Sequence, residues 1–198
     1  MRVISGSAKG RKLKSVPGDT TRPILDRVKE SLFNILSEET EGTRWLDLFA
    51  GTGQVGIEAL SRGATEVVFI DMTKAAIRTI YENLKHCQLI GGAQVLQSDA
   101  FSFLERIGSG QANHDKFDFI FVAPPQYLEL WKKALEIIDG DPDKFLREYG
   151  QVIIQIDPHE NFKDGDGGWR PKHLKLTDQR KYGRTLILFY EVPEVDGE

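Results

Sequence analysis

Residues 45–53 have the sequence WLDLFAGTG, and the rest of the chain can be placed relative to this stretch. It begins with a short apolar run, typical of a parallel strand buried on both faces, made of Trp45, Leu46, Leu48 and Phe49. The small residues 50–53 predict a tight turn, and the apolar pattern of residues 54–62 predicts a helix. A glycine turn between a strand and a helix lets a ligand approach the main chain and the helix N-terminus.

The glycine spacing fits two classes of cofactor. Gly51, Gly53 and Gly56 have the spacing of the dinucleotide fingerprint, and Asp71 stands 20 residues after Gly51, where that fingerprint expects a ribose carboxylate. Asp47 interrupts the strand just below the turn, where it would repel a pyrophosphate but suit a positive sulfonium with an amino-acid tail. A doubly wound domain whose glycines only allow close packing of helix on strand remains a third interpretation.

Composition predicts an ordinary globular protein. The chain has 198 residues, of which 40% are hydrophobic and 28% are charged. No apolar run approaches the roughly 18 residues of a membrane span, and the N-terminal residues lack the apolar core of a signal peptide. The single cysteine, Cys87, fits a reducing compartment, and the four histidines show no metal spacing. We therefore expect a cytoplasmic protein that uses neither a metal nor a membrane.

The net charge of −4 is unevenly distributed along the chain. Residues 1–30 have a net charge of +5, which leaves −9 on the remainder. Two short strand patterns around a glycine-bearing loop predict a basic hairpin arm over residues 1–20, in front of a domain over residues 21–198. Because the glycine turn lies elsewhere, deleting residues 1–18 is expected to leave cofactor affinity intact. Cations favour phosphate contact, so RNA is expected to bind through Lys9, Arg11, Lys12, Lys14, Arg22 and Arg27.

Strand and helix patterns alternate along the rest of the chain. A helix is predicted at 26–36, with a core face of Val28, Leu32, Phe33, Ile35 and Leu36. Further helices are predicted at 54–62, 74–89, 101–107 and 127–138, with a helical turn at 144–148. Strands are predicted at 45–50, 66–71, 93–99, 117–122 and 151–156, and a closing pair at 174–178 and 185–191 around the loop 180–184. The alternation predicts an α/β, doubly wound, mostly parallel seven-stranded sheet with an antiparallel closing strand, plus the small N-terminal hairpin.

Carboxylates follow or end three successive strands of the predicted sheet. In doubly wound sheets a ligand lies beyond the carboxyl ends of the strands. Asp71 would accept from both ribose hydroxyls of an adenosine cofactor, and Asp99 from the adenine amine. One acid alone would fit a helix N-cap, but three in order favour the cofactor. The predicted cofactor-binding residues are Asp47, Phe49, Gly51, Thr52, Gly53, Asp71, Met72, Asp99 and Ala100.

The segment after the most apolar strand is the second candidate for chemistry. Two prolines force extended backbone and donate no hydrogen bonds, so their carbonyls would project at the active edge of the sheet. Carbonyls there can accept from an exocyclic amine, and Tyr127 could stack on a flat base. The predicted catalytic segment consists of Ala123, Pro124, Pro125, Gln126 and Tyr127.

Five segments together resemble the bacterial 16S ribosomal RNA guanine-N2 methyltransferase family, within the Rossmann-like S-adenosylmethionine-dependent methyltransferases. They are VISGSAKGRKLKSV, TRPILDRVKESLFNIL, LDLFAGTGQVGIEALSRGA, DFIFVAPPQY and KYGRTLILFYE. The resemblance implies S-adenosylmethionine as methyl donor, a basic hairpin for RNA and a guanine flipped into the pocket. It also implies small-subunit ribosomal RNA or a pre-ribosomal particle as partner, and a monomer in a bacterial cytoplasm or an organelle of bacterial descent.

The chain departs from this family in the catalytic segment. Ala123 stands where the family has Asp or Asn, and Gln126 where it has an aromatic residue, with Tyr127 one position later. The Gln126 side-chain oxygen or the Pro124 carbonyl would then replace the missing acceptor. Three alternatives remain open: a nicotinamide oxidoreductase, a non-catalytic RNA-binding or ribosome-assembly protein, and a methyltransferase acting on another amine, such as adenine or a protein glutamine.

Overall fold

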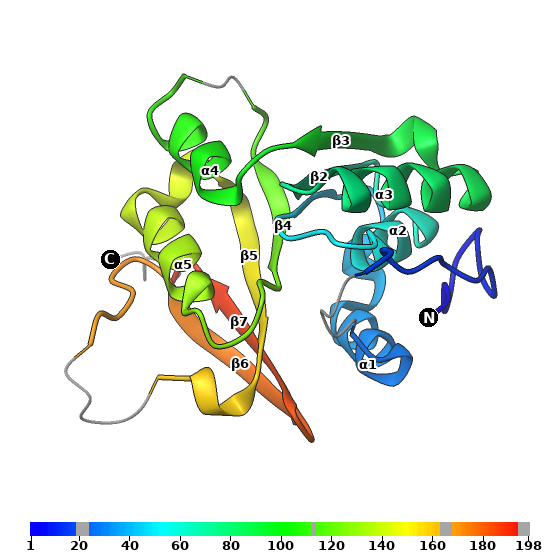
Figure 1. Ribbon diagram of the computed structural model, residues 1–198. Helices are drawn as coiled ribbons and strands as arrows, with labels where there is room; N and C mark the ends of the chain where they lie inside the picture. The colour runs from blue at the N-terminus through cyan, green and yellow to red at the C-terminus, as the bar shows by residue number, and fades with distance from the viewer. Residues whose placement is uncertain (19–23, 112–113, 163–167, 194–198) are drawn as a thin grey trace. The chain divides into compact units, whose positions relative to one another are not determined.

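The computed structural model describes residues 1–18, 24–111, 114–162 and 168–193 (Figure 1). Its seven strands have the order β3-β2-β1-β4-β5-β7-β6 in one mixed sheet, so the predicted α/β class is confirmed. The chain divides into two compact units, residues 1–100 and residues 101–198. The predicted boundary between an arm and a domain, after residue 20, stays a prediction.

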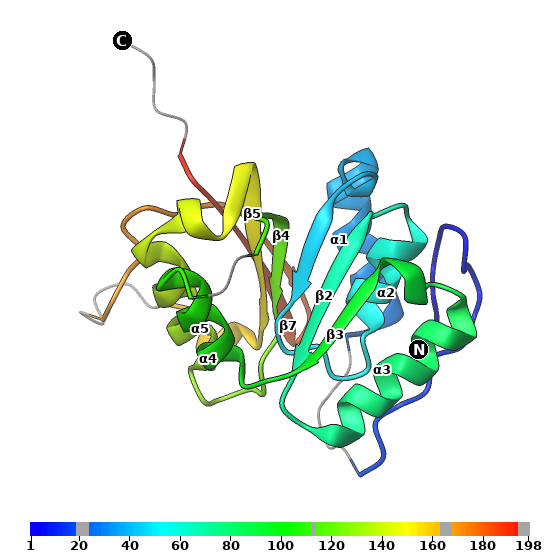
Figure 2. The same ribbon diagram turned by 90° about the horizontal axis from the view of Figure 1, so that it is seen from above.

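The first unit contains three parallel strands and three helices. The strands are β1 (Arg44–Asp47), β2 (Glu66–Asp71) and β3 (Ala93–Gln97), and the helices are α1 (Asp26–Leu36), α2 (Gln54–Ser61) and α3 (Lys74–Cys87). Short 3-10 turns occupy Ser37–Thr40 and Ile90–Gly92. β2 pairs in parallel with both β1 and β3, which places Asp47 beside Phe69 and Asp71 beside Gln97. Figure 2 shows α2 and α3 on the same face of these strands.

Burial explains why these segments form their elements. β1 is buried along its whole length, and β2 is buried at its four central residues, as expected for parallel strands covered on both faces. α1 buries four of the five predicted core residues, but Ile35 is 38% exposed and its placement in the core was wrong. Gly56 is required for packing, because a Cβ there would lie 2.3 Å from Cε1 of Phe69. The third glycine of the fingerprint therefore lets α2 approach β2 closely.

The N-terminal arm, residues 1–18, doubles back as predicted but forms no continuous strands. Arg2 and Lys12 make an isolated antiparallel bridge. The Val3 amide donates to the Arg11 carbonyl over 3.0 Å, and the Gly10 amide donates to the Val3 carbonyl over 2.9 Å. The amides of residues 4, 5, 7 and 8 instead donate to Glu58 and Ser61 of α2, which removes them from any hairpin ladder. Figures 1 and 2 show the arm beside α2 and α3.

The second unit contains four strands and helix α5 (Leu130–Gly140), and α4 (Ala100–Gly108) begins at the last residue of the first unit. β4 (Phe117–Val122) is parallel to β5 (Leu146–Ile156). β7 (Thr185–Glu191) is antiparallel to both β5 and β6 (Lys175–Tyr182), as predicted for the closing pair. Short 3-10 turns occupy Pro142–Lys144 and Pro158–Glu160. Among the described helices, none combines the length and apolar character needed to cross a membrane.

Three predicted boundaries in the second unit were wrong. The helix expected from residue 127 begins at Leu130, because Tyr127 and Glu129 have φ of 64° and 54°, outside the right-handed helical region. The helical turn expected at 144–148 is largely the start of β5, where Leu146 pairs with Phe117. The loop expected at 180–184 is mostly strand, because pairing of β6 with β7 continues to Tyr182 and Thr185.

Candidate functional site

The glycine turn between β1 and α2 has free space beside Gly51 but is tightly packed at Gly53. Gly51 and Gly53 have φ of 54° and 74°, in the left-handed region that favours glycine. A Cβ on Gly51 would meet no atom within 4 Å, whereas one on Gly53 would lie 3.2 Å from Cγ1 of Ile80. The turn is closed by a hydrogen bond of 2.7 Å from the Gly53 amide to the Ala50 carbonyl. The main chain at Gly51 therefore has the free space that a ligand would need.

Asp71 organises this turn. Its Oδ2 accepts from the Gly51 amide at 3.0 Å, and its Oδ1 accepts from the amide and hydroxyl of Thr73 at 2.9 and 3.0 Å. Thr73 Oγ1 in turn accepts from the Ala76 amide, which caps α3 as predicted. The half-buried carboxylate thus connects the glycine turn to the start of α3. Its contact with a ribose stays a prediction.

Asp47 acts on the first turn of α2. Its carboxylate is 2% exposed, and its Oδ2 accepts from the Gly56 amide at 3.2 Å. α2 begins at Gln54 after Gly53, which has no side chain to cap it, so Asp47 supplies the missing acceptor from the strand. Burial raises the pKa of Asp47 to about 7, opposed by the Gly56 hydrogen bond and assisted by the charge of Asp71. Direct contact of Asp47 with a cofactor stays a prediction.

The remaining predicted cofactor residues differ in exposure. Met72 is 67% exposed and Asp99 is exposed, at the ends of the neighbouring strands β2 and β3. Gln97 connects the two strand ends, because its Nε2 donates to the Met72 carbonyl at 3.1 Å. Phe49 is half-buried, and Thr52 and Ala100 are 8% and 5% exposed. The first unit therefore brings Asp71, Met72 and Asp99 to one edge of its sheet.

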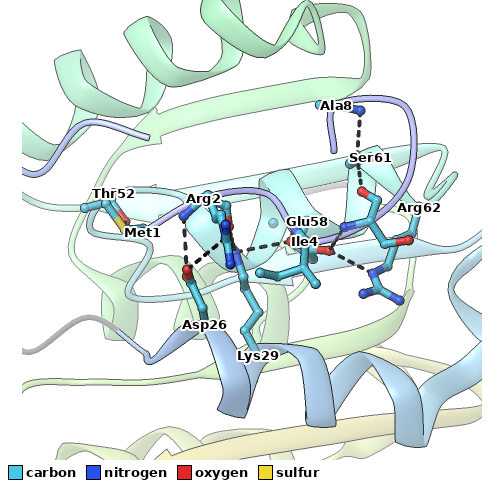
Figure 3. Close-up of polar contacts among 12 residues, drawn as sticks. Met1, Arg2, Ile4, Ala8, Asp26, Lys29, Thr52, Glu58, Ser61 and Arg62 are labelled. Atoms are coloured by element: carbon cyan, nitrogen blue, oxygen red, sulfur yellow. Dashed lines mark hydrogen bonds and ion pairs between the residues drawn. The ribbon is translucent and has the colours of Figure 1, made fainter. Parts of the chain in front are cut away.

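The N-terminal arm is fastened to α2 by Glu58, whose carboxylate also forms a buried ion pair with Lys29 of α1 that the sequence pattern did not predict (Figure 3). Lys29 Nζ lies 3.2 Å from Glu58 Oε2, and both side chains are fully buried. Glu58 also accepts from the amides of Ile4 and Ser5 at 2.8 and 3.0 Å and from Arg62 Nε at 2.9 Å. Burial lowers the pKa of Lys29, an effect that the Glu58 carboxylate opposes. A lysine inside the apolar face of α1 was the available signal for this pair.

Ser61 makes the second anchor of the arm. Its hydroxyl accepts from the Ala8 amide at 2.9 Å and donates to the Ser5 carbonyl at 2.6 Å, and its carbonyl accepts from the Ser7 amide at 2.8 Å. A Cβ on Gly6 would lie only 1.6 Å from the Ser61 carbonyl oxygen. This close approach requires glycine, so the backbone of the arm lies directly against α2.

The arm also contacts the glycine turn, so the expectation that the turn lies elsewhere was wrong. Thr52 Oγ1 donates to Met1 Sδ at 3.4 Å. Asn83 Nδ2, on α3, donates both to the Thr52 carbonyl at 2.9 Å and to the Lys14 carbonyl at 3.1 Å. Leu13 and Val16 are buried and hold residues 13–16 of the arm against the first unit, so the arm returns to the glycine turn.

The predicted RNA-binding cations have different surroundings. Arg11 donates to the His86 carbonyl and to Gln88 Oε1, and Lys14 forms an ion pair of 2.8 Å with Glu82. Lys12 is exposed, as are Lys9 and Arg27, which line one cavity of about 410 Å³. Arg22 lies outside the described residues. The other residues that line this cavity are Arg2, Val3, Ile4, Gly10, Asp26 and Glu30.

In the second unit, the predicted catalytic segment presents a fixed aromatic ring. Ala123 and Gln126 are half-buried, Pro124 is buried and Pro125 is exposed. Tyr127 is 59% exposed, although its amide donates to Glu160 Oε2 at 2.7 Å and its hydroxyl donates to Asp157 Oδ2 at 2.9 Å. The two carboxylates hold both ends of this residue, so the exposed ring has a defined orientation.

Asp157 and Glu160 were missed as the residues that position Tyr127. They form a capping box on the 3-10 turn after β5, a pattern that the spacing D-x-x-E indicates. Asp157 is 1% exposed and also accepts from the amide and ring of His159 at 3.0 and 2.7 Å. The His159 amide, ahead of the His159 ring and the Tyr127 hydroxyl, lowers the pKa of Asp157 to about 2 against the effect of burial.

Comparison with known proteins supports the resemblance seen in the motifs. Residues 1–191 match the family model described as Conserved hypothetical protein 95. A Bacillus subtilis protein named "Putative rRNA methyltransferase YlbH" is 40% identical over 191 residues, which cover 96% of this chain and 98% of the relative. The Escherichia coli K12 "Ribosomal RNA small subunit methyltransferase D" is 30% identical over 182 residues, which cover 92% and 87% of the two chains.

A solved structure shows the same fold. The protein described as "Putative methyltransferase yhhF from Escherichia coli" superposes with a TM-score of 0.77 at 29% identity, and the match covers 97% of each chain. Because the match covers nearly the whole chain, the likeness extends over both compact units. The chain therefore belongs to the Conserved hypothetical protein 95 family, and its 30% identity to the relative from Escherichia coli also places it in the ribosomal RNA small subunit methyltransferase D family.

Proposed function

We propose that this chain transfers a methyl group from S-adenosylmethionine to the exocyclic N2 amine of a guanine in small-subunit ribosomal RNA. The observation that carries the proposal is the free space beside the main chain of Gly51, whose amide donates to the Asp71 carboxylate. Family membership and the names of the relatives support a methyltransferase acting on ribosomal RNA. The choice of guanine N2 rests on the resemblance of the motifs and on the proline pair, which can accept hydrogen bonds but not donate them.

The first unit offers residues that fit the cofactor. The glycine turn gives main-chain access at Gly51, while Asp71 and Asp99 offer carboxylates to the ribose and adenine, with Met72 and Ala100 as apolar neighbours. When bound, S-adenosylmethionine would supply an electrophilic methyl group on a sulfonium. The chain's own task is to orient it, and in-line transfer depends chiefly on such positioning. Asp47 contributes indirectly, because it caps the helix that follows the turn.

The second unit offers residues that fit the target base. Tyr127 provides an exposed ring for stacking, held by Asp157 and Glu160. Bonding of the amine nitrogen to the methyl carbon would break the bond from that carbon to sulfur and leave a neutral thioether, and the amine would release a proton to water. An oriented hydrogen-bond acceptor assists that loss. The methyl side chain of Ala123 cannot be that acceptor, so the Gln126 side-chain oxygen or the Pro124 carbonyl takes the role.

The arm is proposed as the RNA contact. Lys9, Lys12 and Arg27 are exposed, so they are available to phosphates. Replacing Lys9 and Lys12 by alanine should reduce the slope of log affinity against log salt by about 0.7 to 0.9 for each phosphate that is no longer neutralised. The matched control is Lys172→Ala, also a lysine outside any helix or strand but in the second unit. An unchanged slope would mean that residues 1–20 are not the RNA-binding part of the chain. In a monomer, RNA contact would then fall to the domain over residues 21–198.

The decisive experiment measures tritium transfer from labelled S-adenosylmethionine onto unmethylated small-subunit RNA and particles, followed by mass spectrometry of the nucleosides. The wild type should produce N2-methylguanosine. Tyr127→Ala should lose about 1–3 kcal/mol of base stacking, which is roughly a 5- to 150-fold loss of transfer. The matched control is Tyr149→Ala, which removes another exposed tyrosine with positive φ from the same unit. Methylation at another position of guanine, or on adenine, would contradict the proposed specificity.

A second candidate function is favoured by Ala123 alone. A non-catalytic RNA-binding or assembly protein would bind both S-adenosylmethionine and RNA without transferring the methyl group. In that case Ala123→Asp would create activity by restoring an acceptor. In an active enzyme Ala123→Asp should be tolerated or should raise turnover. Single-turnover assays on the wild type and Ala123→Asp therefore separate the two functions.

A further inference from the structure

Asn83 has an unusual position for a polar residue on α3. Its side chain is 1% exposed, and its side-chain carboxamide forms hydrogen bonds to residues outside α3. A buried carboxamide is costly unless its partners are supplied, and here they are three main-chain groups. Those groups come from two segments that are far apart in the sequence, the N-terminal arm and the glycine turn.

On the side of the arm, Asn83 binds the main chain of Lys14 at both ends. Asn83 Oδ1 accepts from the Lys14 amide at 2.8 Å, and Nδ2 donates to the Lys14 carbonyl at 3.1 Å. This two-point contact resembles the pairing of a neighbouring strand. The neighbouring Leu13 amide donates to the Met1 carbonyl at 3.2 Å, so the first residue of the arm lies beside residues 13–14.

On the side of the turn, Asn83 holds Thr52, the residue between the two glycines of positive φ. Nδ2 donates to the Thr52 carbonyl at 2.9 Å, and Thr52 Oγ1 donates to Met1 Sδ at 3.4 Å. The adjacent amide, that of Gly51, is held by Asp71. The turn that is proposed to receive the cofactor is therefore fixed by Asp71 on one side and by the arm, through Asn83 and Met1, on the other.

We infer that Asn83 is a positioning residue that couples docking of the N-terminal arm to occupancy of the glycine turn. The inference rests on the proposed cofactor at this turn. Anything that steadies the docked arm favours the bound form of the turn, and by linkage a bound cofactor steadies the arm. RNA held by the arm then raises cofactor affinity, and S-adenosylmethionine raises RNA affinity by the same factor. The coupled partners are a phosphate backbone and a sulfonium cofactor.

The test compares Asn83→Asp with Ser61→Ala in the full-length chain. Asn83→Asp keeps the acceptor for the Lys14 amide but loses the donor to the Thr52 and Lys14 carbonyls. Ser61→Ala weakens the same arm interface, through Ala8 and Ser5, without touching the turn. S-adenosylhomocysteine affinity is measured by calorimetry without RNA, alongside thermal stability. Asn83→Asp should weaken binding roughly 5- to 10-fold, the low end of typical coupling. Ser61→Ala loosens the arm but leaves Asn83 bonded to the Thr52 carbonyl, so it should weaken binding in the same direction by a smaller factor. Equal losses in the two variants, or no loss in Asn83→Asp, would overturn the inference.

Hydrogen exchange of the wild type gives an independent readout that requires no substitution. S-adenosylhomocysteine should slow amide exchange in residues 10–14 of the arm as well as in residues 51–53, and protection confined to the turn would overturn the coupling. Absence of any binding would instead overturn the proposed cofactor. The coupling would then be tested by exchange in the two variants without ligand, where Asn83→Asp should speed exchange at residues 51–53 more than Ser61→Ala does. If the calorimetry and exchange results hold but the protein does not bind RNA, only the proposed RNA substrate would be contradicted.

Discussion

Asp47 in the first unit and Asp157 in the second are both buried carboxylates, 2% and 1% exposed, at the ends of strands that lead into site segments. Burial raises the pKa of Asp47 to about 7, because the hydrogen bond from the Gly56 amide does not offset desolvation and Asp71 adds a like charge. The pKa of Asp157 falls to about 2, because the His159 amide and ring and the Tyr127 hydroxyl all bond to it. Desolvation thus dominates for Asp47, to which a single amide donates, whereas hydrogen bonds dominate for Asp157, to which several groups donate.

The two units therefore support their site segments differently. In the glycine turn, Asp71 accepts from the Gly51 amide and Asn83 donates to the Thr52 carbonyl, so both contacts are to the main chain, while the ion pair of Lys29 with Glu58 lies behind the arm. In the second unit, the carboxylates of Glu160 and Asp157 bind both the amide and the side-chain hydroxyl of Tyr127. Substitutions in the first unit should thus act on the main chain of the turn and on the arm, and those in the second unit on the Tyr127 side chain.

The largest expected effect comes from breaking the buried pair that fastens the arm. Glu58→Gln leaves the Lys29 ammonium buried without its anion, which should lower the free energy of unfolding by about 3–5 kcal/mol. The control Glu82→Gln breaks an exposed ion pair of the same arm and should change stability little. Chemical denaturation followed by circular dichroism measures both. Equal effects would show that Glu58 does not anchor the arm.

The pH dependence of stability should distinguish the two carboxylates. The pKa of Asp47 is higher when folded, about 7 against 3.8, so the folded state holds an extra proton between these values. Its contribution is complete below the unfolded pKa and is lost as pH rises through the folded one, by up to about 4 kcal/mol. Asp47→Asn should therefore flatten the fall in stability between about pH 4 and 7.

The pKa of Asp157 shifts in the opposite direction, so its effect on stability falls in a different pH range. Its folded pKa is lower, about 2 against 3.8, so its contribution is present above the unfolded pKa and is lost as pH falls through the folded one. Asp157→Asn should flatten stability only in this acid window. Denaturation series from acid to neutral pH on both variants measure the two windows, and a single window shared by both variants would contradict the comparison.

A smaller effect is expected where the arm approaches α2. Gly6 and Gly10 have nearly equal φ, 80° and 83°, so alanine causes similar backbone strain at both, about 1–2 kcal/mol. Only at Gly6 does the added Cβ collide with the Ser61 carbonyl, so Gly6→Ala should destabilise more than Gly10→Ala and should detach the arm. Protease sensitivity of residues 1–18 and thermal midpoints check this. Equal sensitivity of the two variants would mean that the arm adapts without detaching.

The sequence predicted the local features and missed the long-range ones. Strand and helix alternation, the glycine turn and the Thr73 cap follow from neighbouring residues, and all appear in the structure. The anchors Glu58 and Ser61 stand more than 50 positions after Ser5, the arm residue that both contact, and no local pattern specifies that pairing. The left-handed φ of Tyr127 likewise depends on Glu160 and Asp157, which lie 33 and 30 positions later.

The smallest expected effect separates the ring of Tyr127 from its hydroxyl. Tyr127→Phe removes one donor to Asp157, which should raise the pKa of Asp157 and lower stability by about 1 kcal/mol, the net value of a hydrogen bond. Because the ring and its main-chain bond to Glu160 remain, methyl transfer should stay near that of the wild type, unlike in Tyr127→Ala. The matched control is Tyr149→Phe, since that tyrosine is 77% exposed and should show neither change. Acid denaturation and the single-turnover assay measure the two quantities separately. If Tyr127→Phe loses as much transfer as Tyr127→Ala, then the hydroxyl and its contact with Asp157 matter to the reaction more than the stacking surface does.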